Sequence, residues 1–130
     1  FMPTKAEQKA LEESAINDKI KAELSEAKIK GIPQINPHKI DVSEFTFDNS
    51  HINAVREHGV TRAEAEQFIK ESDISLTRWK GRFINYYGPN GATYVDVENN
   101  NIRTAFKKEQ FDAPTLKIRE VAEKYGNKKD

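Results

Sequence analysis

Two histidines lie seven residues apart in a stretch that the sequence predicts to be a short helix closed by Gly59. His51 and His58 would share one face of that helix, with their Cα atoms about 10 Å apart along the axis. Histidine pairs that bind metal on helices are spaced three or four residues apart, so no metal site is expected. The helix dipole favours a protonated ring for His58 in the last turn and a neutral ring for His51 near the start. The pair would then supply an acid and a base; the alternative is that one histidine caps or packs while the other is solvated.

Cationic and hydroxyl side chains elsewhere complete the set that metal-free RNA cleavage requires. Such a site needs one group to remove the proton from the 2′-hydroxyl, another to protonate the leaving oxygen, and cations beside the phosphate. Arg56 lies on the same predicted helix as the histidines, and Arg103 and Thr104 lie on the last predicted strand. Arg103 could stabilise the charge that builds on the phosphate, and Thr104 could hold one of its oxygens. The alternative for Thr104 is an ordinary β-branched strand residue.

Aromatic residues and positive charge coincide between residues 78 and 108. The chain of 130 residues has a net charge of zero, which argues against indiscriminate binding to nucleic acid. This segment, however, holds six Lys or Arg and only two Asp or Glu. Trp79 or Tyr87 could stack on an unpaired base, and Arg82 and Lys107 could contact phosphates. The alternative is an ordinary sheet whose aromatic residues fill the core and whose cations face solvent.

The elements that must position these residues follow from the spacing of apolar side chains. Residues 4–30 predict one long helix that begins with a Thr-x-x-Glu capping box. Its apolar stripe is thin and suits a connector better than a core helix. Glycine and two prolines between 31 and 37 predict a linker. We therefore expect a helical connector and Pro-containing linker over 1–38 and the compact domain over 39–130.

Within the compact domain, helical patterns come first and strand patterns follow. Helices over 51–58 and 61–71 precede four strands at 74–79, 82–87, 92–97 and 102–106, and a last helix is expected over 115–125. An Asn-Gly pair between the second and third strands is a strong hairpin signal. The sequence predicts an α+β fold with N-terminal helices, a four-stranded antiparallel meander and a C-terminal helix.

The composition excludes several other classes of site. The chain has no cysteine, which excludes disulfides, zinc–thiolate sites and cysteine nucleophiles. Neither a run of about 18 apolar residues nor a signal-peptide pattern occurs, so no membrane partner is expected. No glycine-rich phosphate loop and no Ser-His-Asp pattern is evident, and no cofactor is expected.

An ordered series of short blocks runs from Phe47 to Tyr125. The blocks are Phe47-Asp48 with His51, Arg56 with His58, Val60-Thr61, Glu64-Ala65 with Phe68-Ile69, Tyr86-Tyr87, Gly91-Ala92 with Tyr94-Val95, and Ile102-Arg103-Thr104-Ala105-Phe106 followed by Phe111-Asp112. In this order they resemble the phage-associated barnase/EndoU/colicin/RelE-like (BECR) nuclease domains, which occur at the C-terminal ends of phage minor head and head-morphogenesis proteins. The resemblance covers about the last two-thirds of the chain and leaves out the N-terminal helix.

This resemblance implies a BECR-like α+β fold and a metal-independent ribonuclease that cleaves RNA by transesterification. It also implies that the domain belongs to a phage or mobile-element protein, in the host cytoplasm or the virion. The partners to expect are RNA, a larger phage structural protein in the same polypeptide or assembly, and an immunity protein. The expected catalytic residues are His51, His58, Arg103 and Thr104. The expected substrate-binding residues are Arg56, Trp79, Arg82, Tyr87 and Lys107.

A different class of function competes with this hypothesis. In a non-catalytic module of a phage head-morphogenesis protein, the sheet would bind a protein partner and the long N-terminal helix would join the domain to a larger body. The two hypotheses differ in one geometric respect. In a nuclease, the two histidines, Arg103 and Thr104 should converge on one open cleft.

Overall fold

A six-stranded mixed sheet forms the centre of the protein in the computed structural model, which describes residues 2–126. The strands are β1 (Ile32–Ile35), β2 (Thr46–Phe47), β3 (Ile74–Arg78), β4 (Phe83–Tyr87), β5 (Gly91–Asp96) and β6 (Asn101–Lys107), in the spatial order β1-β3-β4-β5-β6-β2. The four expected strands form the predicted antiparallel meander, β3 to β6. The structure adds β1, antiparallel at one edge, and β2, parallel at the other. The α+β class is confirmed, and the predicted four-stranded meander is part of a larger sheet of six strands.

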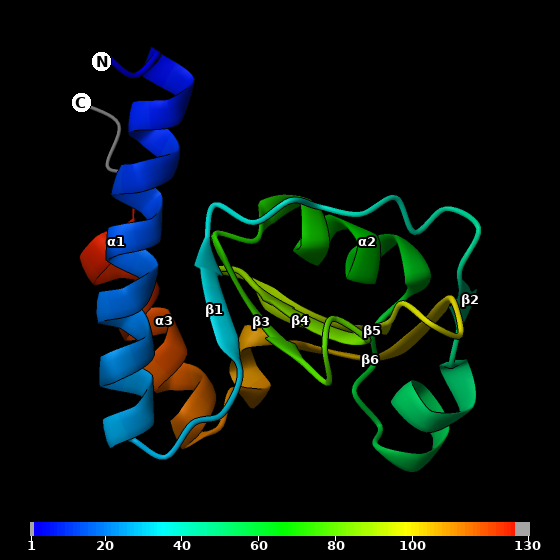
Figure 1. Ribbon diagram of the computed structural model, residues 1–130. Helices are drawn as coiled ribbons and strands as arrows, with labels where there is room; N and C mark the ends of the chain where they lie inside the picture. Colours follow the sequence, from blue (N-terminus) through cyan, green and yellow to red (C-terminus); the bar gives the residue numbers. More distant parts are fainter. Residues whose placement is uncertain (1, 127–130) are drawn as a thin grey trace.

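Three α-helices cover the two faces of this sheet (Figure 1). Helix α2 (Arg62–Glu71) lies on one face, and α1 (Lys5–Glu26) and α3 (Ala113–Tyr125) pack together on the other. The predicted capping box of Thr4 with Glu7 is present at α1, and Thr61 forms the same motif with Glu64 at α2. Within the described residues, no helix combines the length and the apolar character needed to cross a membrane.

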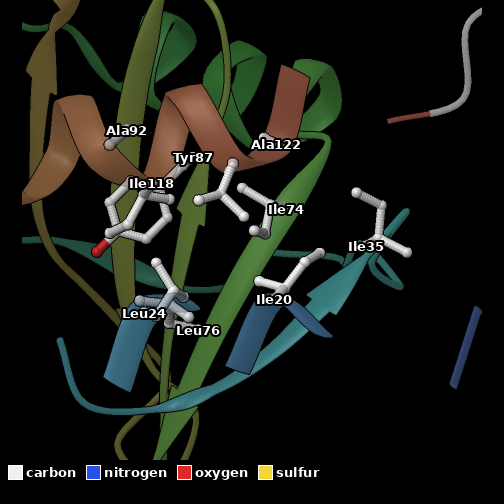
Figure 2. Close-up of a cluster of buried hydrophobic side chains, with 10 residues drawn as sticks. Ile20, Leu24, Ile35, Ile74, Leu76, Tyr87, Ala92, Ile118 and Ala122 are labelled. Atoms are coloured by element: carbon white, nitrogen blue, oxygen red, sulfur yellow. The ribbon is translucent and has the colours of Figure 1, made fainter. Parts of the chain in front are cut away.

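The second half of α1 belongs to the core rather than to a separate connector. Ile20 and Leu24 are at most 1% exposed and pack with Ile74 and Leu76 of β3, and α3 closes the same cluster (Figure 2). The stripe of α1 is thin because only these last turns meet the sheet, while the first turns are largely exposed. The expectation that residues 1–38 lie outside the compact domain is therefore corrected.

The expected linker is also part of the sheet. Ile32–Ile35 pairs with β3 as an edge strand and buries alternate side chains. Pro33 is compatible with this position because an edge strand needs to pair through only one of its sides. The Ile35 backbone N–H, on the side away from β3's ladder, donates to the side-chain oxygen of Asn17 in α1 (2.8 Å). Helix α1, strand β1 and the meander are thus one packed unit.

The segment that holds the histidines is not the regular helix that we expected. It forms a short π-helix, η1 (Ser50–Val55), and His58 lies beyond its end. The side chain of Asn53 accepts from the N–H of Val60 and donates to its carbonyl, both at 2.8 Å, and these bonds fold the loop back onto the helix. Glu57 and Gly59 have positive φ values of 54° and 65°, which a continuing helix does not allow. The sequence pattern missed this loop because side-chain bonds to the backbone compete with helix formation.

Candidate active site

A pocket of about 290 Å³ opens between the η1 loop, strands β5 and β6, and the start of α3. The side chains around it are His51, Arg56, His58, Tyr94, Thr104, Phe106, Gln110 and Asp112. Residues far apart in the chain meet here because the η1 loop follows β2 along the β6 edge of the sheet. The pocket thus brings together both predicted histidines, Thr104 and Arg56.

A β-bulge places Arg103 and Thr104 on the same face of the sheet. Tyr94 pairs with Thr104 and Val95 pairs with Ile102, so Arg103 is an additional residue on β6. In a regular strand, adjacent side chains point to opposite faces. Here the Arg103 guanidinium lies 4.5 Å from the centre of the Phe83 ring and 5.8 Å from that of Tyr94, which lines the pocket. Arg103 therefore adjoins the pocket through Tyr94.

The guanidinium of Arg103 has hydrogen-bond donors without an acceptor in residues 2–126. Its Nε and Nη2 atoms are buried and have no protein acceptor within the described residues. Burial lowers the pKa of Arg103, the nearby charge of Arg78 lowers it further, and Asp96 opposes both effects. The guanidinium nevertheless stays charged at any physiological pH. A half-buried cation with unused donors is suited to an anionic ligand such as a phosphate.

The ring of His58 is partly buried in the wall of the pocket. Its ring packs against Phe106, with the ring centres 5.7 Å apart. Burial lowers the pKa of His58, the charges of Arg56 and His51 lower it further, and Gln110 has an opposing effect. The expectation that a helix dipole would keep His58 protonated was wrong, because η1 ends at Val55 and His58 lies in the following loop.

Three polar side chains form a hydrogen-bonded row that ends at the pocket. Asn85 Nδ2 donates to the Tyr87 hydroxyl (3.2 Å), and the Tyr87 hydroxyl donates to that of Tyr94 (3.1 Å). Burial raises the pKa of Tyr94, which therefore stays protonated. Because Tyr94 accepts from Tyr87, its own proton is free to be donated into the pocket.

Buried polar atoms without a protein partner gather around this site. Among the described residues they are His58 Nδ1, Asn85 Oδ1, Arg103 Nε and Arg103 Nη2. Each such atom costs about 1–3 kcal/mol when nothing satisfies it. All belong to side chains in the pocket or on the face of the sheet opposite α2, beside Tyr87 and Tyr94. Their concentration at one place indicates a site built for a polar ligand.

Four predicted substrate-binding residues lie outside the pocket. Tyr87 is only 3% exposed and cannot stack on a base; it supports Tyr94 instead. Arg82 pairs with Asp96 (3.2 Å) and Glu98 (3.4 Å), and Lys107 pairs with Glu64 of α2 (3.7 Å). Trp79 was expected at the end of a strand, but it lies in the β3–β4 turn, where it is 73% exposed.

Sequence reasoning passed over several residues of the pocket. Tyr94 appeared only in the blocks of the resemblance, and local spacing gives no reason to prefer it to Tyr87, because both flank the same hairpin. Phe106 was noted only as part of a sequence block, although it shares a face with Tyr94 in the ladder. Gln110 ends a short 3₁₀ helix that follows β6, and Asp112 lies in the irregular segment after it. No periodic pattern in such segments predicts which way a side chain points.

Within residues 2–126, no group of three or more histidine or acidic side chains is placed to hold a metal ion. No protein-family model matches the chain, and no curated protein or solved structure matches it either. The assignment of a function therefore depends on the residues of the pocket.

Proposed function

We propose that this chain is a BECR-like nuclease domain that cleaves RNA without a metal ion. One observation carries the proposal: His51, His58, Arg56 and Thr104 line one pocket, and Arg103 adjoins it with two donors unused. These are the side-chain types that phosphodiester cleavage by proton transfer needs, and they come from two distant parts of the chain. The resemblance of the sequence blocks to BECR domains supports the same activity.

The proposed reaction is a transesterification within the RNA. Neutral His58 removes the proton from a 2′-hydroxyl, whose oxygen attacks the adjacent phosphorus. The bond from phosphorus to the 5′-oxygen of the next nucleotide breaks, and His51 gives that oxygen a proton. The products are a 2′,3′-cyclic phosphate and a 5′-hydroxyl, so atoms and charges balance. Proton transfers of this kind contribute about 10²–10⁴-fold each to the rate.

The remaining side chains act on the phosphate. Arg103 stabilises the negative charge that increases on its oxygens in the transition state, and Tyr94 donates its free proton to one of them. Thr104 positions the phosphate, and the exposed Arg56 attracts it at the rim of the pocket. We further propose that the domain acts within a phage structural protein, in the host cytoplasm or the virion, where an immunity protein restrains it.

Cleavage of total RNA in EDTA tests this proposal. His51→Ala and His58→Ala should each reduce cleavage by about 10²-fold or more. His38→Ala is the matched control, because His38 is exposed and does not line the pocket. An oligonucleotide with a single 2′-deoxy sugar at the cleaved position should stay intact. Equal cleavage by the wild type and both pocket variants would overturn the proposal and leave the non-catalytic interaction module as the better hypothesis.

A further inference from the structure

A second concave surface lies at the end of α1, away from the pocket described above. This basic groove, of about 930 Å³, runs between the last turn of α1, the loop to β1 and the β3–β4 turn. Its cations are Lys21, Lys28, Lys30, Arg78 and Lys80, and the residues that line it include no Asp or Glu. None of these cations forms an ion pair within the described part of the chain. A surface with this charge is complementary to a polyanion.

Trp79 stands on the edge of the basic groove in a costly backbone conformation. Trp79 and the following Lys80 both have φ of 55°, in the left-handed region that favours glycine. The turn closes with a hydrogen bond from Gly81 N–H to the Arg78 carbonyl (3.3 Å). The Trp79 residue is 73% exposed in this turn. Strained residues that present a side chain to solvent often mark a binding site.

A row of aromatic and cationic side chains joins the basic groove to the catalytic pocket. The Trp79 and Phe83 rings pack in a T-shaped arrangement, with the ring centres 6.3 Å apart. Arg103 lies over the same Phe83 ring at 4.5 Å and over Tyr94 at 5.8 Å. Tyr94 lines the pocket. The two sites therefore lie along one continuous strip of the sheet.

We propose that the basic groove binds the single-stranded RNA on one side of the bond that the pocket cleaves. Phosphates would follow the lysines of α1 and its loop, and one unpaired base would stack on Trp79. This inference rests on the proposed ribonuclease function. Single-stranded RNA fits better than an acidic polypeptide, because an exposed indole beside cations and a path to a phosphate-cleaving pocket match an alternating series of bases and phosphates. Helix α1 is then part of the substrate-binding surface.

Binding of an uncleavable RNA measures this interaction apart from catalysis. The probe is a 2′-O-methyl oligomer of about 12 nucleotides with a fluorescent label. Trp79→Ala should weaken its binding about tenfold. The triple variant Lys21→Gln, Lys28→Gln, Lys30→Gln should lower the salt dependence of log Kd by about 2, close to the loss of three phosphate contacts. The matched control is Lys5→Gln, Lys9→Gln, Lys19→Gln, which removes the same charge from α1 outside the groove and should bind nearly as the wild type does.

Three outcomes would overturn the inference. Equal losses in the two triple variants would show only a diffuse effect of charge. Poly-glutamate that binds as tightly as the RNA, with the same dependence on Trp79, would identify an acidic polypeptide as the ligand. Binding unchanged by Trp79→Ala and by the groove triple variant would remove the groove from RNA recognition, even if the wild type cleaves RNA.

Cleavage assays keep this inference distinct from the proposed function. Trp79→Ala should lower kcat/KM for the long substrate by much more than it lowers kcat/KM for a dinucleotide that reaches only the pocket. If the wild type cleaves no RNA in EDTA but binds the oligomer through Trp79, the proposed reaction fails and the RNA-binding groove stands.

Discussion

The pKa of His58 is set by burial and not by the end of a helix. The residue lies against Phe106 in the loop after η1, where neighbouring cations add to the effect of burial. The neutral ring that results can accept a proton at neutral pH, which is the role that the proposed reaction gives it. The proposed reaction assigns the role of proton donor to His51, which is half-buried at the same pocket.

This lowered pKa predicts a dependence of stability on pH. The unfolded chain takes up a proton on this histidine near its ordinary pKa of about 6.5, whereas the folded protein does so only at lower pH. The contribution of His58 to the unfolding free energy is therefore complete above about pH 6.5 and decreases as the pH falls below it. Urea unfolding between pH 4 and 8 should show this decrease in the wild type and in His38→Gln. The decrease should be smaller in His58→Gln; an identical pH dependence in all three proteins would contradict the assignment.

Tyr94 provides a second prediction for a single side chain. Tyr94→Phe removes the hydroxyl proton that the proposed reaction donates to the phosphate, and it leaves the packing against Phe106 in place. If this proton stabilises the transition state, kcat should fall about 10²-fold with little change in KM. Tyr87→Phe should have a smaller effect, because Tyr87 acts only through Tyr94. Equal effects of the two substitutions would argue against direct contact of Tyr94 with the phosphate.

Strand β6 shows how one irregularity within an element shapes the site. The bulge at Arg103 lets two adjacent side chains serve the same face of the sheet. Near the other end of the strand, the ladder is regular and Lys107 pairs with Gly91. At Gly91, α2 lies so close to β5 that a side chain on β5 would collide with the helix.

A Cβ atom on Gly91 would lie 2.4 Å from Cε2 of Phe68 in α2. Gly91→Ala should therefore lower the unfolding free energy by about 1–3 kcal/mol, because the buried Phe68 ring must move. Chemical denaturation of the variant measures the loss. In the double variant with Phe68→Leu, the smaller side chain should make the cost of Gly91→Ala lower than in the wild-type background. Simple additivity of the two losses would show that the ring is not the obstacle.

At the scale of the whole molecule, the N-terminal helix completes one of the two cores. It contributes Ile20 and Leu24 to the cluster on the face opposite α2. Its Lys21 lines the basic groove, together with Lys28 and Lys30 of the loop that follows the helix. The ion pair between Arg119 and Asp73 ties α3 to the start of β3 on this face. The same helix thus contributes both to the core and to one wall of the basic groove.

Two leucines of α1 distinguish a core helix from a connector. Leu24→Ala should reduce the unfolding free energy by about 2–5 kcal/mol, since Leu24 is 1% exposed. Leu11→Ala, on the same helix but 63% exposed, should change it by no more than about 0.5 kcal/mol. Thermal or urea unfolding of the two variants measures both values. A small effect for Leu24→Ala, similar to that of Leu11→Ala, would show that α1 does not pack on the sheet.

The sequence by itself determined the features that depend on neighbouring residues. The capping boxes at Thr4 and Thr61, the meander from β3 to β6 and the α+β class all follow from local spacing and turn residues. The types of residue suited to RNA cleavage were also visible, because a histidine or an arginine carries its chemistry wherever it lies.

Only the tertiary structure decided which of these residues meet. Ile32–Ile35 forms a strand because it pairs with β3. Arg103 and Thr104 lie on the same face because the bulge shifts the pairing of β6 with β5. The pocket brings His58 to Tyr94 and buries it, which reverses the charge state expected from a helix end. Strand pairing, register and burial depend on segments that are distant in the chain, so they cannot be predicted from local periodicity.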